Sequence, residues 1–293
     1  MSAQEGLVLG KTYSAEPDAR KKPSRGRFAL GKWPLPVYSA LALAFLLIPI
    51  VYTIVFSFNV QTGKSNISWS GFTFANWTSV CAEQDVCAAF GTSILIGLVA
   101  TVAATILGTM IAIALVRYRF PFRSAVSLLI FLPMATPEVV MGAGLAAQFL
   151  SAGIPKGIGT IMIAHTLFCL SFVVVTVKAR AASLDPALEE AGRDLYGSPF
   201  QVFLRITLPL LLPGILAAAL LSFSLSFDDF IITYFNSGTV QTFPTYIYIS
   251  AQRGIPAQAN VIASAVFFIA IAIVVISQIV TQSRQKRLNA AAR

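Results

Sequence analysis

Three acidic residues stand within long apolar stretches of the sequence: Glu138, Asp228 and Asp229. If these stretches cross a membrane, each carboxylate costs about 2.5–3.5 kcal/mol to insert, so it should face a cavity, a partner or a substrate. Carboxylates in such a cavity attract ammonium groups, sodium ions or protons. Aromatic side chains that can add cation–π contacts of about 0.5–2 kcal/mol flank the aspartate pair: Phe227, Phe230 and Tyr234. The sequence therefore indicates a path for a cation.

The remaining residues offer little for bond-making chemistry. His165 is the only histidine, so no metal cluster with several imidazoles can form, and its place within an apolar stretch favours a packed, hydrogen-bonded role. Residues 26–32 nearly fit a phosphate-binding loop, but Trp33 replaces the required Ser or Thr and no strand precedes it. We therefore expect a protein that is not an enzyme and that binds no cofactor and no metal itself.

The composition excludes a soluble protein. Hydrophobic residues make up 56% of the 293 residues and charged residues only 11%, whereas a soluble domain has about 25% charged residues. The mean hydropathy of +0.77 agrees. A soluble enzyme, a disordered chain and a disulfide scaffold are all excluded. We expect an all-α integral membrane protein.

The apolar stretches predict six membrane-spanning helices, because a span needs about 20 mostly apolar residues. The predicted spans are 35–58, 88–116, 122–150, 157–177, 206–230 and 258–281. Residues 230–252 are also uncharged, but they are rich in Tyr and contain Asn236 and Pro244. We interpret this segment as an outer loop with a short interfacial helix, with a seventh span as the alternative. The transmembrane domain then covers 34–283, between polar tails 1–33 and 284–293.

The distribution of basic residues predicts the orientation. With the N-terminus inside, 18 of the 21 lysines and arginines fall on the cytoplasmic side, as the positive-inside rule requires. Both termini are then cytoplasmic. This bias explains the net charge of +9, because cytoplasmic basic residues can contact anionic lipid headgroups. A nucleic-acid partner is not needed to explain the charge.

Counting along straight helices places two of the acids at similar depths. Glu138 lies 16 residues from the cytoplasmic end of its span and Asp228 lies 19 residues from Pro209, which corresponds to about 24 Å and about 28 Å. Both should therefore reach the outer half of the membrane. Pro133 and Pro137 loosen the backbone before Glu138, which is tolerated where a helix lines a cavity.

The loop 178–205 is the longest cytoplasmic connection and contains charges of both signs. Asp185 is a suitable N-cap and Pro186 a suitable first helical residue, so a helix should run from Pro186 to Leu195 and end near Gly197. Apolar residues recur on one face of this helix: Leu184, Leu188, Ala191 and Leu195. A short amphipathic helix of this kind fits a groove on a partner.

The same loop carries a family motif. Glu190-Ala191-Gly192, followed by Leu208-Pro209, resembles the E-A-A loop of the membrane subunits of binding-protein-dependent ABC importers. The resemblance implies a coupling helix that docks on an ATPase subunit. Tyr196 stands where the motif has Gly, which predicts a turn shifted by one residue to Gly197. The residues expected at the ATPase are Asp185, Leu188, Glu189, Glu190, Ala191, Gly192, Arg193, Asp194, Leu195 and Gly197.

Segments 137–142, 165–177 and 221–230 are similar to spermidine/putrescine-type permeases of that family. The resemblance implies a six-helix type I importer permease (MetI-like) in the bacterial inner membrane. It also implies a heterodimer with a homologous permease, two ATPase subunits that hold ATP and Mg, and an extracytoplasmic binding protein that delivers a polyamine. Glu138, Asp228, Asp229, Phe227, Phe230 and Tyr234 would line the substrate path.

Two alternatives remain at this point. An ion-gradient-driven amine transporter would use the same acids as proton or sodium sites, although it gives no reason for a charged helix in the loop 178–205. A structural role is the alternative to substrate contact for each of Glu138, Asp228 and Asp229, and for Asp229 this role is to cap or pin a helix end.

Two cysteines lie in the first outer loop. An oxidising compartment would allow a bridge between Cys81 and Cys87, and the sequence leaves its formation open. Cys169 lies within the fourth span, where we expect it to pack.

Overall fold

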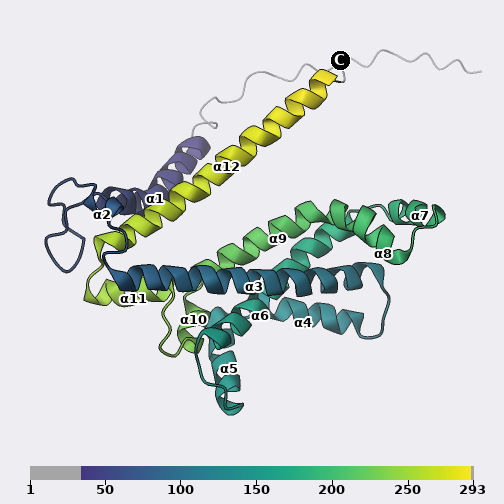
Figure 1. Cartoon of the computed structure of the whole chain (residues 1–293), viewed down its shortest axis with the longest axis horizontal. Helices are drawn as coiled ribbons and strands as arrows, with labels where there is room; N and C mark the ends of the chain where they lie inside the picture. Colours follow the sequence, from purple (N-terminus) through teal and green to yellow (C-terminus); the bar gives the residue numbers. More distant parts are fainter. Residues whose placement is uncertain (1–33, 292–293) are drawn as a thin grey trace, which may run out of the picture. The chain divides into compact units, whose positions relative to one another are not determined.

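The computed structural model describes residues 34–291, drawn in Figure 1. The basic tail predicted for 1–33 lies outside these residues, as do the last two residues. The chain forms two compact units, Met1–Pro49 and Ile50–Arg293. The described part of the first unit is the beginning of α1 (Pro34–Phe56), an apolar helix long enough to cross a membrane.

The second unit is built from helices and loops. Its helices are α2 (Ala75–Thr78), α3 (Gln84–Arg117), α4 (Arg123–Ala135), α5 (Glu138–Ser151), α6 (Ile158–Ala182), α7 (Ala187–Asp194), α8 (Pro199–Val202), the π-helical turn η2 (Phe203–Thr207), α9 (Leu208–Asp228), α10 (Ile231–Asn236), α11 (Phe243–Arg253) and α12 (Ala257–Ala291). By length and composition, five helices within residues 34–291 can cross a membrane, or six if α4 and α5 form one broken span.

The third predicted span, 122–150, is not a continuous helix. It breaks between α4 and α5, whose axes are bent by 109°. Pro137 has no N–H to continue the helix and disfavours a helical conformation at Thr136. The Thr136 hydroxyl donates to the Leu132 carbonyl at 2.7 Å and so closes the end of α4. The break lies directly before Glu138, so the depth predicted for this residue along the helix stays a prediction.

Several other predicted boundaries also differ. The loop 178–205 is largely helical, because α8 and η2 continue directly into α9 as one stretch, Pro199–Asp228. The last helix continues to Ala291, well beyond the predicted end at 281. Residues 230–252 form two short helices, α10 and α11, instead of one, and neither is long enough to cross a membrane.

The core lies between α3, α6 and α9, which run beside one another (Figure 1). Small residues allow this close approach: Ala104, Gly108, Ala112, Ala164 and Ala218 are all buried. A side chain at Gly108 would place its Cβ only 2.6 Å from a γ-carbon of Val173 on α6. Without a hydrophobic driving force between helices in lipid, such contacts carry the packing.

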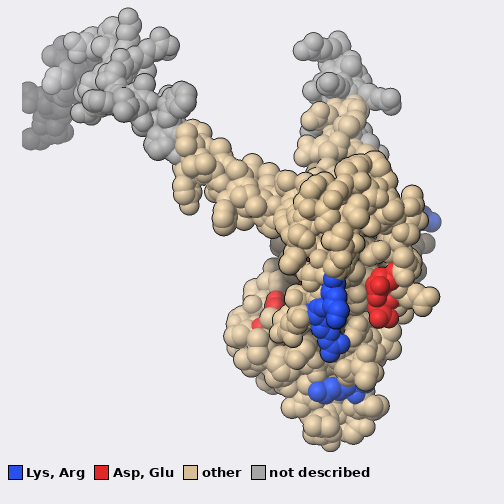
Figure 2. Space-filling view, turned by 90° about the vertical axis from the view of Figure 1, so that its left-hand side faces the viewer, with Lys and Arg blue, Asp and Glu red and all other residues tan. Residues whose placement is uncertain are grey.

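A second, smaller core joins α3, α11 and α12 through Val86, Phe243 and Ile262. The Ser93 hydroxyl accepts a hydrogen bond from the Phe243 N–H at 2.8 Å, which fixes the start of α11 against α3. Figure 2 shows the molecule from the side on which α2 and α11 lie in Figure 1, and on this side the basic and acidic side chains form separate patches.

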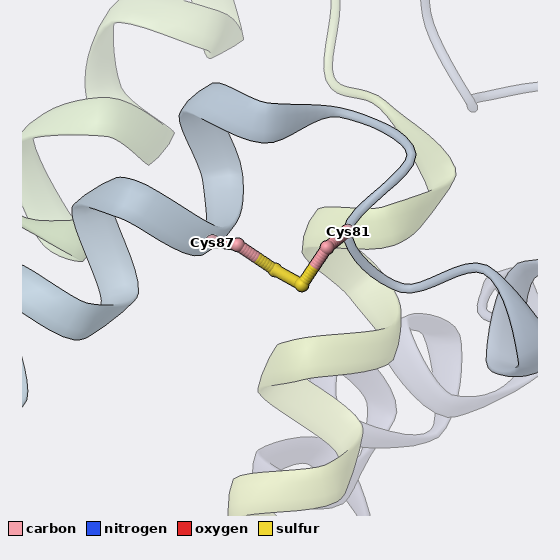
Figure 3. The surroundings of a disulfide bond; sticks show 2 residues. All are labelled: Cys81 and Cys87. Carbon is pink, nitrogen blue, oxygen red and sulfur yellow. A yellow bond between two sulfur atoms is a disulfide. The ribbon is translucent and has the colours of Figure 1, made fainter.

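The segment between α2 and α3 is closed by a disulfide between Cys81 and Cys87 (Figure 3). The sequence left this bridge open. Cys169 is a free, buried thiol on α6. Ahead of α2, Asn59 donates to the Asn66 side chain at 2.7 Å and to the Ser68 carbonyl at 2.8 Å. The loop after α1 is therefore tied together by side-chain hydrogen bonds.

The α3–α6 contact predicts a large difference between two glycine substitutions. Gly108→Ala should destabilise the protein by about 1–3 kcal/mol, because the new methyl group overpacks the contact with Val173. Gly144→Ala on α5 is the matched control, since nothing lies within 4 Å of its Cβ position, and it should be neutral or stabilising. Thermal unfolding of the purified protein in one detergent compares the two. Equal unfolding midpoints would contradict the packing described here.

Candidate transport pocket and coupling helix

The break before α5 places Glu138 at the first position of that helix, with its side chain exposed in this chain. Two contacts hold α5 against α10. The Asn236 side chain donates to the Gly142 carbonyl at 3.2 Å, and a Cβ at Gly142 would lie 3.2 Å from the Cα of Ile232. The position of Glu138 is therefore set by α10, which follows the aspartate pair in the sequence.

Glu138, Asp228 and Asp229 line one pocket of about 330 Å³, which we call the acidic pocket. Glu138 enters from the start of α5, whereas Asp228 and Asp229 come from the end of α9. Phe230 also lines this pocket, together with Phe168, Ser224, Leu225 and Ile231. Four of the six residues predicted for the substrate path thus lie together.

The two aspartates differ in their surroundings. Asp228 is exposed, whereas Asp229 is buried. The Asp229 carboxylate accepts hydrogen bonds from the backbone N–H groups of Ile232 at 3.3 Å and Thr233 at 2.8 Å, which caps the first turn of α10. This geometry favours the structural alternative for Asp229 and leaves Asp228 and Glu138 as the accessible carboxylates.

His165 connects the Asp229 cap to two further helices. Its Nε2 lies 3.1 Å from the Asp229 carboxylate and 2.8 Å from the Thr233 hydroxyl. Its Nδ1 lies 2.7 Å from the Ser226 hydroxyl on α9. The imidazole is almost fully buried on α6. Sequence reasoning placed His165 in a packed role but had no signal for its partners, which lie 61 to 68 residues away.

The other two predicted aromatic residues lie elsewhere. Phe227 does not line the acidic pocket; its ring packs 5.9 Å from Phe90 and 5.9 Å from Phe223. Tyr234 lines a second pocket of about 430 Å³ that also includes Lys156. Tyr234 and Phe230 meet Tyr248 of α11, whose ring lies 4.6 Å from that of Phe230. Tyr248 was not predicted as a site residue, because residues 230–252 have the composition of an outer loop.

The predicted coupling helix is present as α7, one residue shorter at each end than predicted. The Asp185 carboxylate accepts a hydrogen bond from the Ala187 N–H at 2.9 Å and caps the helix. Most of the residues expected at an ATPase are exposed: Asp185, Leu188, Glu190, Ala191, Arg193, Asp194 and Leu195. Tyr196 and Phe200 extend this exposed surface, with 99% and 69% of their surface accessible.

Glu189 and Gly192 face the protein instead. Glu189 forms an ion pair with Arg117, the last residue of α3, at 2.9 Å. Its carboxylate also accepts a hydrogen bond from the Thr207 hydroxyl at 3.1 Å. A Cβ at Gly192 would lie 2.5 Å from the side chain of Ile206. α7 is therefore attached to the end of α3 and to the beginning of the α9 stretch.

The turn after α7 is not shifted by one residue, so that prediction is wrong. Tyr196 itself adopts the left-handed conformation, with φ of 59°, at the position of the motif glycine. The Tyr196 N–H donates to the Arg193 carbonyl and the Gly197 N–H donates to the Gly192 carbonyl, which is the Schellman arrangement of a helix end. Gly197 is needed for a different reason, because its Cβ would lie 2.6 Å from the Gly192 carbonyl oxygen.

Comparison with known proteins identifies the family. Residues 104–291 match the family model described as "Binding-protein-dependent transport system inner membrane component". The chain belongs to this family of transport permeases. This membership favours the importer over the ion-gradient transporter that the sequence left open.

Two similar relatives match this chain over nearly their whole length. The "Spermidine/putrescine transport system permease protein PotC" of Haemophilus influenzae is 36% identical over 241 residues, which are 82% of this chain and 93% of that protein. The protein of the same name from Escherichia coli K12 is 34% identical over 263 residues, 89% of this chain and 97% of that protein.

The fold is shared with a solved importer. A chain from the crystal structure of a bacterial ABC transporter involved in the import of the acidic polysaccharide alginate superposes with a TM-score of 0.61 at 16% identity. The match covers 88% of this chain and 99% of that chain. The fold is that of type I ABC importer permeases, as the sequence predicts.

The turn after α7 makes two neighbouring positions respond differently. Gly197→Ala should destabilise the protein by about 1–3 kcal/mol, because the new methyl group meets the Gly192 carbonyl. Tyr196→Gly should change stability by less than about 0.5 kcal/mol, because two effects oppose each other. Glycine removes about 1–2 kcal/mol of strain from the left-handed conformation, but it loses more backbone entropy than tyrosine when the protein folds. Thermal unfolding of the purified protein measures both. A larger loss for Tyr196→Gly than for Gly197→Ala would refute this description of the turn.

Proposed function

We propose that this chain is a permease subunit that carries a polyamine, such as spermidine or putrescine, or a related amine across the membrane. The acidic pocket is the observation that carries this proposal. Two accessible carboxylates, Glu138 and Asp228, converge there beside the ring of Phe230. Carboxylates and an aromatic face are the groups that attract an alkylammonium ion. The substrates named for the two relatives have the same chemistry.

The energy for transport comes from other chains in this proposal. Two ATPase subunits bind ATP and Mg, and an extracytoplasmic binding protein delivers the substrate. A homologous permease completes the transmembrane pathway. The exposed surface of α7, including Leu188, Leu195 and Tyr196, supports docking on an ATPase, because a short helix with exposed apolar side chains fits a groove.

The attachments of α7 suggest how ATPase closure reaches the pocket. The Arg117–Glu189 ion pair connects α7 to α3, and the contact of Gly192 with Ile206 connects it to α9. α9 carries Asp228 at its far end. A movement of α7 therefore shifts α3 and α9 together and opens the acidic pocket to one side of the membrane or the other.

The proposed orientation places both termini in the cytoplasm of a bacterial cell, with this chain in the inner membrane. The distribution of basic residues supports it. The disulfide between Cys81 and Cys87 also supports it, because this orientation exposes the segment before α3 to an oxidising compartment.

The role of the acidic pocket predicts specific losses of uptake. Glu138→Gln and Asp228→Asn should each lower spermidine uptake by about tenfold, the loss of one charge-assisted contact. Uptake is measured in proteoliposomes containing the whole complex, at saturating binding protein. Asp85→Asn is the matched control, since Asp85 lies at the start of α3 and outside the acidic pocket. Unchanged uptake kinetics in both pocket variants would remove the carboxylates from the substrate path.

The energy source can be tested separately in membrane vesicles. Uptake should require ATP and the binding protein, and it should persist when an ionophore collapses the proton and sodium gradients. Uptake that follows an imposed ion gradient without ATP would overturn the assignment of this chain to an ATP-driven complex.

A further inference from the structure

A third pocket, which is lined mainly by charged side chains, lies beside α7, at the opposite end of α9 from the acidic pocket. It has a volume of about 370 Å³. We call it the arginine pocket, because its charged lining comprises Arg117, Arg119, Arg123, Arg193, Glu189 and Glu190. The first three arginines come from the end of α3, the α3–α4 turn and the start of α4, whereas Arg193 and both glutamates belong to α7.

The charges in this pocket are not balanced. Four guanidinium groups face two carboxylates, which leaves a net formal charge of +2. Glu189 is already engaged by Arg117. Arg119, Arg123 and Arg193 are exposed, and within residues 34–291 their guanidinium groups have no hydrogen-bond or ion-pair partner. An anion with several oxygen acceptors would satisfy them, because guanidinium groups bind phosphate with paired hydrogen bonds.

The position of the pocket indicates the source of this anion. Arg117 ends one candidate membrane span and Arg123 begins the next, so the pocket lies at the ends of two apolar helices that face the same side. Three exposed aromatic residues alternate with the arginines in this turn: Tyr118, Phe120 and Phe122. Exposed rings beside basic side chains are typical of the headgroup level of a bilayer.

We propose that the arginine pocket binds the phosphate-bearing headgroup of an anionic phospholipid. A bound phosphate would contact Arg119 and Arg123 on one wall and Arg193 of α7 on the other. It would therefore join the α3–α4 turn to α7, beside the Arg117–Glu189 ion pair. An anionic lipid then supports coupling between ATP hydrolysis and transport, a consequence that rests on the function proposed for α7.

Lipid binding is tested on the complete complex purified in detergent. Native mass spectrometry measures retention during titration with phosphatidylglycerol or with phosphatidylcholine. Arg119→Gln/Arg123→Gln should weaken phosphatidylglycerol binding by about twenty-five-fold, at about fivefold for each arginine near a lipid surface. Arg205→Gln is the matched control, because Arg205 is exposed on η2 and does not line the pocket, and it should bind like the unchanged protein.

Two further arms identify the ligand. Arg119→Lys/Arg123→Lys keeps the charge but loses the paired hydrogen bonds, so it should bind more weakly than the unchanged protein and more tightly than the glutamine variant. A salt concentration of 0.5 M should weaken retention of phosphatidylglycerol but not of phosphatidylcholine. Either result remains informative if the glutamine variant does not assemble. Equal retention of the two lipids overturns the proposal, as does equal binding by the glutamine variant. Displacement of the lipid by millimolar inorganic phosphate also overturns it, because the site would then bind the free ion.

The effect on coupling has its own readout. In nanodiscs, substrate-stimulated ATPase activity should rise with the fraction of phosphatidylglycerol in the unchanged complex and in Arg205→Gln, but not in Arg119→Gln/Arg123→Gln. If the glutamine variant loses lipid binding but keeps this response, the coupling role is wrong. If the unchanged complex transports no amine at all, the proposed function fails, while the lipid titration still decides whether the site exists.

Discussion

The corner between α9 and α10 depends on one buried polar cluster, in which His165 contacts Asp229, Thr233 and Ser226. Every member lies among apolar helices, where an unpaired polar group costs several kcal/mol. A displacement of any of the three helices would leave buried polar groups without their hydrogen-bond partners. The cluster thereby holds α6, α9 and α10 in one arrangement, and this arrangement turns the neighbouring Asp228 outward to the acidic pocket beside Glu138. The two adjacent aspartates therefore differ in role: Asp229 is hydrogen-bonded within the fold, whereas Asp228 stays accessible.

The other end of the helical core is organised by a different attachment. There α7 is connected to α3 through a single ion pair and to η2 through the close approach of Gly192 to Ile206. The ion pair is partly exposed, with side-chain exposures of 19% and 17%, so it can break and re-form more easily than the buried cluster, whereas Gly192 is buried against Ile206. A buried polar cluster at the acidic-pocket end and a partly exposed ion pair at the α7 end agree with the proposal that movement passes along α3 and α9.

Hydropathy sufficed to predict the apolar helices and their approximate positions, because a span requires a minimum length and an apolar composition. It did not predict the break in the third span or the length of the last helix. Local motifs also sufficed for α7 and its Asp185 cap. Features that depend on packing could not be predicted. The break at Pro137 was anticipated only as a loosening, since its angle is set by the contacts of α5 with α10. The left-handed conformation of Tyr196 was not predicted from the sequence. Its side chain is fully exposed, so it meets no neighbouring side chain in this conformation.

The broken span also has a consequence for hydrophobic mismatch. α4 contains 13 residues and so measures about 20 Å, which is shorter than the hydrocarbon layer of about 30 Å. Leu128, Leu129 and Leu132 are exposed along it, yet Glu138 follows directly beyond its end. Lipid cannot cover this face without thinning around a charge. α4 therefore presents an apolar face that is shorter than the hydrocarbon layer and ends beside a charged residue.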